Sequence, residues 1–207
     1  MHTTRPRQPL SRRHLLIAGG GLAALSLTAC DKVLPVSYNG IDITGANYAK
    51  DFRLTDADGR ERTLADFKGK AVMLFFGFTQ CPDVCPTALV RAAEIRQMLG
   101  ADGKRLQVIF VTVDPERDLP VVLKAYTQAF DTSFIGLYGD LQKTSETAKA
   151  FKVFYKKVPT GSSYTMDHSA FSYVFDPEGK IRLVLRHEQS AQECAEDLHK
   201  ILGKTSA

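Results

Sequence analysis

Two cysteines four positions apart, placed directly after an apolar run, constrain this chain most. Cys81 and Cys85 lie in the segment Cys-Pro-Asp-Val-Cys-Pro, and residues 71–78 before them are mostly apolar, as in a buried strand. Proline is favoured in the first turn of a helix, so Pro82 predicts that a helix begins at this junction. Both cysteines are then expected in its first turn, facing the same way.

The spacing of these thiols allows either sulfur or metal chemistry. Residues i and i+4 of a helix have Cβ atoms roughly 5–6 Å apart, so the sulfurs could form a disulfide or bind one metal ion. The dipole of the helix favours thiolate at its N-terminus, and thiolate is both the nucleophile and the metal ligand. A purely structural disulfide is the alternative, although so short a loop would restrain the unfolded chain little.

The first 29 residues are typical of an export signal. Arginines precede a 15-residue apolar run over 15–29, which is too short to span a bilayer comfortably. Residues 11–16 resemble a twin-arginine signal, and Sec export is the alternative. Residues 27–30, Leu-Thr-Ala-Cys, resemble a bacterial lipobox, which predicts a lipid on Cys30; an unmodified signal-peptide cysteine is the alternative. We therefore expect a periplasmic protein attached to the cytoplasmic membrane through this lipid.

Removing the leader also removes the net positive charge. Four of the 27 Lys and Arg residues and none of the 23 Asp and Glu residues lie in it, so the remainder is formally neutral. The composition then gives no support for nucleic-acid binding. Residues 30–49 show no periodicity and predict a tether, and residues 50–207 are long enough for one domain.

Strand-like and helix-like segments alternate along residues 50–207, which predicts an α/β domain with helices covering a sheet. In order, we expect a hairpin around 56–59, a strand over 72–78, a helix to about 99, a strand over 106–113, a helix capped by Asp118 to about 130, a strand over 134–138, a helix over 142–151, a polar loop over 156–167, a hairpin of 171–175 with 181–185, and a last helix from Ser190. This order is similar to a thioredoxin-like fold with a central sheet, an N-terminal hairpin and an inserted loop before the closing β-hairpin.

A third metal ligand is available downstream. Soft thiolates select copper(I) or zinc, and imidazole also suits copper. His168 directly precedes the closing hairpin, and in a thioredoxin-like fold that position lies beside the start of the cysteine helix. The other candidates have simpler interpretations: Met166 as packing, His187 and His199 as surface residues, Asp114 as part of a turn, Asp118 as a helix cap and Cys194 as a core thiol. The two aspartates could also shape the site.

Three motifs in order resemble the Sco/SenC family. They are Gly-Phe-Thr-Gln-Cys-Pro-Asp-Val-Cys-Pro-Thr at 77–87, Thr-Val-Asp-Pro-Glu-Arg-Asp at 112–118, and Asp-His-Ser at 167–169 followed by Asp-Pro-Glu-Gly-Lys at 176–180. The resemblance covers residues 50–203. It implies a membrane-tethered chaperone that binds one copper ion through Cys81, Cys85 and His168 and helps build the dinuclear copper centre of cytochrome c oxidase.

The resemblance also implies partners and an anchor. The partners would be the copper-bearing subunit of the oxidase and other copper chaperones or thiol reductases. Many members of the family use a transmembrane helix, where this chain is expected to use the lipid on Cys30.

A redox function competes with copper delivery. In a thiol:disulfide reductase, Cys81 would attack a partner disulfide and Cys85 would resolve the mixed intermediate. The two functions are compatible, because metal binding also requires the reduced pair. A peroxidase is the weakest interpretation, since the spacing reveals no activating groups for a low-pKa cysteine. Whether the protein is an enzyme is therefore left open.

Overall fold

The structure, a computed structural model, describes residues 36–203. The predicted leader and Cys30 lie outside them. The helices and strands are β1 (Ile41–Asp42), β2 (Leu54–Asp56), β3 (Glu61–Arg62), β4 (Ala71–Gly77), α1 (Val84–Met98), β5 (Leu106–Thr112), α2 (Pro120–Gln128), β6 (Ile135–Tyr138), α3 (Leu141–Ala150), β7 (Tyr155–Thr160), β8 (Ser163–His168), β9 (Ser172–Phe175), β10 (Ile181–Leu185) and α4 (Ala191–Leu202), with 3-10 turns at Leu64–Phe67 and Gly100–Arg105.

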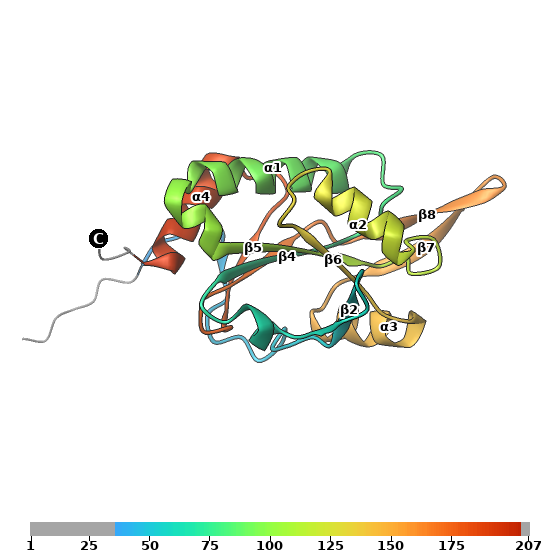
Figure 1. Ribbon diagram of the computed structural model, residues 1–207, viewed down its shortest axis with the longest axis horizontal. Coiled ribbons are helices and arrows are strands. Elements are labelled where there is room, and N and C mark those ends of the chain that lie inside the picture. Colours follow the sequence, from blue (N-terminus) through green and yellow to red (C-terminus); the bar gives the residue numbers. More distant parts are fainter. Residues whose placement is uncertain (1–35, 204–207) are drawn as a thin grey trace, which may run out of the picture. The chain divides into compact units, whose positions relative to one another are not determined.

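A mixed sheet forms the centre of the domain. Within residues 36–203 it has eight strands in the order β1-β10-β9-β4-β5-β6-β2-β3. β4, β5 and β6 are parallel, β9 is antiparallel to β4, and β10 is antiparallel to β9. α1 and α2 lie on one side of the sheet and α3 on the other (Figure 1). This arrangement confirms the predicted thioredoxin-like α/β fold.

The core lies on both faces of the two central strands. Every residue of β4 and β5 is buried, as expected for parallel strands covered by helices. Successive side chains point to opposite faces, so Phe75 packs with Phe110 while Phe76 packs with Phe151 and Tyr173. These aromatic contacts fix the position of the end of β4, from which the cysteine segment departs.

The last helix is amphipathic and begins where predicted. Ser190 is its N-cap, and the Ser190 and Glu193 side chains bond to each other's backbone N–H groups in a capping box. Cys194 is fully buried on its inner face, which confirms the predicted core thiol, and burial raises its pKa to about 11.

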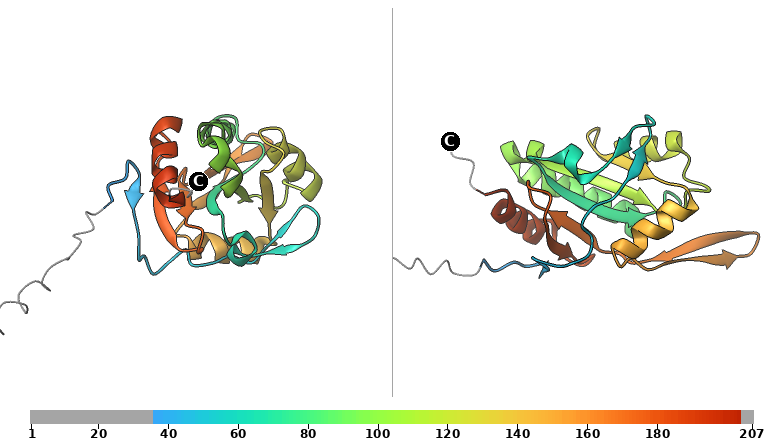
Figure 2. Two further views of the ribbon diagram at one scale, coloured as in Figure 1. Left: turned by 60° about the vertical axis from the view of Figure 1, so that its left-hand side comes forward. Right: turned by 90° about the horizontal axis from the view of Figure 1, so that it is seen from below.

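The predicted polar loop over 156–167 is instead a ribbon. β7 and β8 pair with each other as a separate two-stranded sheet, with Tyr155 opposite His168. The ribbon extends away from the main sheet (Figures 1 and 2). The sequence did not reveal it because most of its residues are polar and only Met166 in the two strands is buried, so the apolar alternation of a half-buried strand is missing.

Part of the predicted tether packs on the domain. β1 pairs with β10, and the buried carboxylate of Asp197 accepts hydrogen bonds from the backbone N–H groups of Asn39 at 3.0 Å and Gly40 at 2.7 Å. The division into leader, tether and domain stays a prediction. In residues 36–203, no helix is long and apolar enough to cross a membrane.

Candidate metal centre

The cysteine segment follows β4 and runs into α1. α1 begins at Val84, with Asp83 as N-cap at φ −139° and ψ −80°, outside the helical region. Cys85 is therefore in the first turn, whereas Cys81 lies before the helix. The prediction that both cysteines share the first turn, with Pro82 starting the helix, is wrong. Pro86 occupies the first turn instead, where a missing N–H is tolerated.

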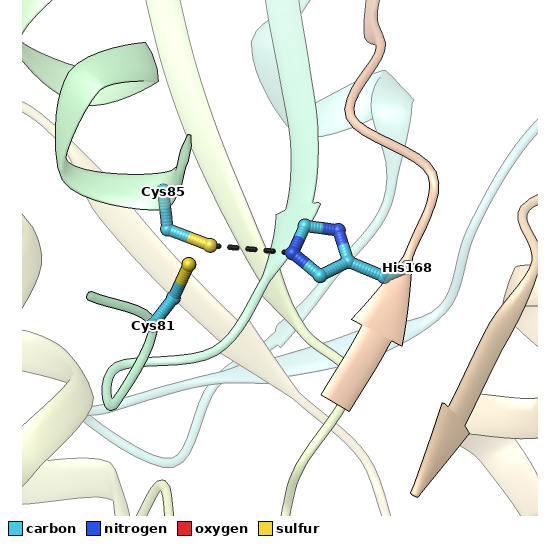
Figure 3. A group of neighbouring side chains, drawn as sticks. All are labelled: Cys81, Cys85 and His168. Atoms are coloured by element: carbon cyan, nitrogen blue, oxygen red, sulfur yellow. Dashed lines mark hydrogen bonds between the residues drawn. The ribbon is translucent and has the colours of Figure 1, made fainter. Parts of the chain in front are cut away.

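The two sulfurs and one imidazole converge despite this difference. Cys85 Sγ lies 3.4 Å from His168 Nε2. The ligand atoms of Cys81, Cys85 and His168 all lie within 4.8 Å of one another. Figure 3 shows both sulfurs and the ring pointing to one place, with Cys85 coming from the start of α1, Cys81 from the loop before it and the histidine from the end of β8. The convergence predicted from the sequence is confirmed.

The imidazole is held in an orientation suited to metal binding. His168 Nδ1 lies 3.1 Å from the carbonyl oxygen of Ser169. A carbonyl can only accept, so the matching tautomer carries its proton on Nδ1 and directs the Nε2 lone pair to the sulfurs. Phe75 and Phe78 contact the ring edge-on, each with centroids 5.9 Å from it. These contacts fix both the tautomer and the plane of the ring.

The two thiols differ in protonation. A hydrogen bond from the Cys85 thiol holds the pKa of Cys81 well below its usual range, and the backbone N–H groups of Asp83 and Cys85 act in the same direction. The neighbouring Cys81 sulfur and burial raise the pKa of Cys85. In the metal-free protein the negative charge is therefore on the partly exposed Cys81, and the proton is on the buried Cys85.

Gly77 makes room for the buried sulfur. A Cβ at this position would lie 2.8 Å from Cys85 Sγ and 2.8 Å from Phe110. The sequence showed Gly77 as part of the first motif, without a role. A glycine at the end of a buried strand indicates a close approach of another group, and this was the available signal.

Asp118 has a different role from the one expected. Leu119, and not Asp118, is the N-cap of α2. The buried Asp118 carboxylate accepts hydrogen bonds from Thr79 N–H at 3.0 Å, Thr79 Oγ1 at 2.6 Å and Thr112 Oγ1 at 2.6 Å. It therefore ties the segment before Cys81 to the end of β5. The sequence left open that Asp118 shapes the site, but its partner Thr79 could not be identified because it lies 39 positions away.

The remaining candidates are placed as follows. Asp114 forms the predicted turn, and its carboxylate also contacts Arg117 and the Tyr164 hydroxyl. Met166 is buried, as expected for packing. Among residues 36–203, the group of potential metal ligands contains neither His187 nor His199.

Comparison of the chain with known proteins identifies its family. The SCO1/SenC family model matches residues 42–203. The chain belongs to the SCO1/SenC family. A SCO2-like protein of Rickettsia felis is 37% identical, over 89% of this chain and 91% of its own. Human "Protein SCO2 homolog, mitochondrial" is 32% identical, over 95% of this chain and 77% of its own.

Solved SCO1/SenC structures share the fold. The structure of Bradyrhizobium japonicum ScoI with copper bound is 39% identical, with a TM-score of 0.67 over 73% of this chain and 97% of its own. Yeast Sco1 with copper bound is 33% identical, with a TM-score of 0.67 over 76% of this chain and 90% of its own.

Proposed function

We propose that this SCO1/SenC protein binds one copper ion through Cys81, Cys85 and His168 and delivers it during assembly of cytochrome c oxidase. The observation that carries the proposal is the convergence of two sulfurs and an imidazole nitrogen within 4.8 Å. Copper is bound in the relatives of Bradyrhizobium japonicum and yeast, which supports this assignment.

The donor set fits copper. Metal bonds to sulfur and imidazole nitrogen are about 2.0–2.3 Å long, so three ligands around one ion are roughly 3.5–4 Å apart. The observed 3.4 Å between Cys85 Sγ and His168 Nε2 is close to this separation. Thiolate and imidazole together are ligands that copper(I) accepts, whereas magnesium and calcium prefer oxygen.

The burial of the ligands suggests how the ion would be transferred. Cys85 is fully buried, whereas Cys81 and His168 are partly exposed. A partner with soft ligands can reach the ion from the side of Cys81 and His168 and exchange with them one at a time. The receiver we propose is the dinuclear copper site of the oxidase. No turnover of a substrate is required, so this function is not enzymatic.

His168→Ala tests the proposal, with His199→Ala as the matched control, because His199 is exposed on α4. Affinity for copper(I) is measured anaerobically by competition with bicinchoninate. Loss of one of three ligands is expected to weaken binding at least about 100-fold, and His199→Ala should bind as the parent does. Unchanged copper affinity in His168→Ala would show that the assignment is wrong.

A thiol:disulfide reductase is the second candidate, favoured by the lowered pKa of Cys81 beside a buried Cys85. The Cys81 thiolate would attack a partner disulfide, form a mixed disulfide and release one partner thiolate. Cys85 would then lose its proton and attack Cys81, releasing the second partner thiol. Two electrons pass to the partner, and an external dithiol must reduce the resulting Cys81–Cys85 disulfide.

The same His168→Ala variant separates the two functions. Reduction of a protein disulfide is measured in parallel with copper binding. The imidazole ligates copper but is not required for sulfur exchange. Loss of copper with unchanged disulfide reduction would assign the reductase at most a secondary function.

We also propose that a lipid on Cys30 holds the protein at the periplasmic face of the cytoplasmic membrane. The support is the lipobox-like sequence of residues 27–30 after an apolar run. Metabolic labelling with a fatty acid, followed by fractionation, tests this. Cys30→Ser is expected to lose the label and leave the membrane fraction. A variant that keeps the label would contradict the assignment.

A further inference from the structure

One loop contacts both segments that supply the proposed copper ligands. Residues 113–119 connect β5 to α2. Within this loop, Asp118 binds Thr79, which lies two residues before Cys81. Arg117 contacts Tyr164, which lies on β8 four residues before His168. The cysteine segment and the histidine ribbon, far apart in sequence, are therefore attached to the same short loop.

Arg117 contacts the β7–β8 ribbon at Tyr164, both directly and through Asp114. Its Nη1 donates a hydrogen bond of 2.8 Å to the Tyr164 carbonyl, and its guanidinium carbon lies 3.6 Å from the centroid of the Tyr164 ring. Its Nε pairs with the Asp114 carboxylate, whose other oxygen accepts from the Tyr164 hydroxyl at 2.9 Å. Arg117, Asp114 and Tyr164 thus form a closed set of contacts, and the Asp114 side chain is almost fully buried.

The Arg117 guanidinium also lies near Phe78, one of the two aromatic rings that contact the His168 imidazole. Its carbon is 6.0 Å from the centroid of Phe78, and the Phe78 ring meets the His168 ring edge-on. Arg117 therefore adjoins both the strand that carries His168 and one of the rings that orient its imidazole.

The ribbon needs such an attachment. A two-stranded hairpin is marginally stable without further packing, and β7 and β8 form a sheet of their own. A second connection to the loop joins Lys157 to Glu116, but both side chains are nearly half exposed, and exposed ion pairs contribute little. The partly buried contact at Arg117 is better placed to fix the orientation of the strand.

We propose that Arg117 is a positioning residue that, through Tyr164, holds His168 over the two sulfurs. This inference rests on the proposed copper function. By keeping the imidazole in place before the ion arrives, Arg117 reduces the ordering that copper binding would otherwise require. Arg117 itself makes no contact with the ion.

The central test is copper(I) affinity, measured by competition with bicinchoninate in the full chain. Arg117→Ala is expected to weaken binding about tenfold, in the range observed for groups that orient metal ligands. Arg117→Lys should recover little of the loss, because an ammonium lacks the planar fork that stacks and bonds here. Glu116→Gln is the matched control, since it removes the neighbouring exposed ion pair, and it should change affinity less than twofold.

A second background separates positioning from general stabilisation. In a chain that already carries His168→Ala, adding Arg117→Ala should change copper affinity less than twofold, because the residue through which Arg117 acts is gone. An equal tenfold loss in both backgrounds would overturn the inference. Parental affinity in Arg117→Ala alone would also overturn it. If His168→Ala itself bound copper as the parent does, the proposed function would fail instead.

The metal-free protein provides an independent readout. Hydrogen exchange of the backbone amides of β8 is expected to accelerate in Arg117→Ala, while β4 and β5 keep their protection. Unchanged protection of β8 would contradict the inference. If Arg117→Ala fails to fold, Tyr164→Phe removes the hydroxyl bond to Asp114 and keeps the ring. It should weaken copper binding about threefold, and parental affinity in this variant would count against the proposal.

Discussion

Cys81 and Cys85 have the same chemistry but different surroundings, and a pH profile can show the difference. The Cys85 thiol donates a hydrogen bond to Cys81 and lowers the pKa of Cys81. Cys81 is therefore a thiolate at pH values well below the pKa of an ordinary cysteine. Alkylation of the reduced, metal-free protein by iodoacetamide should therefore proceed at a nearly constant rate between about pH 5 and pH 8, where an ordinary thiol accelerates roughly tenfold per pH unit.

The control for this profile is Cys85→Ala. It removes the first cause of the shift, so the pKa of Cys81 should rise and the alkylation rate should fall at low pH. Modified residues are located by mass spectrometry of peptides. A steep increase with pH at Cys81 in the parent protein would contradict the assigned protonation.

Gly77 is a second single-residue determinant of the site. Gly77→Ala would place a Cβ within 2.8 Å of Cys85 Sγ, which must then move. We expect a loss of about 1–3 kcal/mol in the free energy of unfolding, as in other overpacked cores, together with weaker copper binding. Urea unfolding and copper competition measure the two effects.

Cys85→Ala in the same chain gives the matched comparison. Removing the sulfur relieves part of the crowding, so the double variant should lose less stability than the sum of the single variants. Phe110 and Phe75 still crowd the new methyl group, so recovery should be partial. A Gly77→Ala protein within about 0.5 kcal/mol of the parent would refute the steric argument.

At the scale of elements, the segment between β4 and α1 depends on the neighbouring β5–α2 loop. The Thr79 hydroxyl donates to the buried Asp118 carboxylate at 2.6 Å. Thr79→Ala removes one donor from this carboxylate, so we expect a loss of about 1.5–3 kcal/mol in urea unfolding, the usual range for a hydrogen bond to a charged group. Thr79→Ser keeps the hydroxyl and should retain most of the stability. Equal losses in both variants would mean that the methyl group, and not the hydroxyl, matters.

The elements also show where prediction from sequence succeeds. The buried strands β4 and β5, the closing hairpin and α4 follow from apolar runs, turn residues and a capping serine, all of which are local signals. The β7–β8 ribbon does not, because its attachment at Arg117 and Tyr164 joins residues 47 positions apart. The partner of Asp118, Thr79, could not be predicted for the same reason. The ligand convergence could be predicted because the thioredoxin-like order of elements brings the two segments together.

For the whole molecule, no pattern in the sequence indicated that residues before 50 belong to the folded unit. β1 has two residues and no periodicity, so only its pairing with β10 reveals it. Residues 36–203 belong to one compact unit. The proposed lipid anchor on Cys30 therefore precedes the first described residue, Val36, by few positions in the sequence.

Asp197 provides a test of this attachment. Its fully buried carboxylate accepts the backbone N–H groups of Asn39 and Gly40 through separate oxygens. In Asp197→Asn one of these N–H groups must face an amide N–H₂ group, so a partly buried donor loses its acceptor. We expect the free energy of unfolding to fall by about 1–3 kcal/mol in urea, with faster hydrogen exchange in residues 39–43.

The neighbouring Glu196→Gln is the matched control for this effect. Glu196 contacts the Asn39 side chain at the exposed surface of the same helix, so its replacement should change stability by no more than about 0.5 kcal/mol. Equal stability of Asp197→Asn and Glu196→Gln would mean that the buried carboxylate does not hold this segment. A selective loss in Asp197→Asn, with copper affinity unchanged, would show that attachment of the N-terminal segment and ligand geometry are independent, because Asp197 and the copper ligands share no contacts among the described residues.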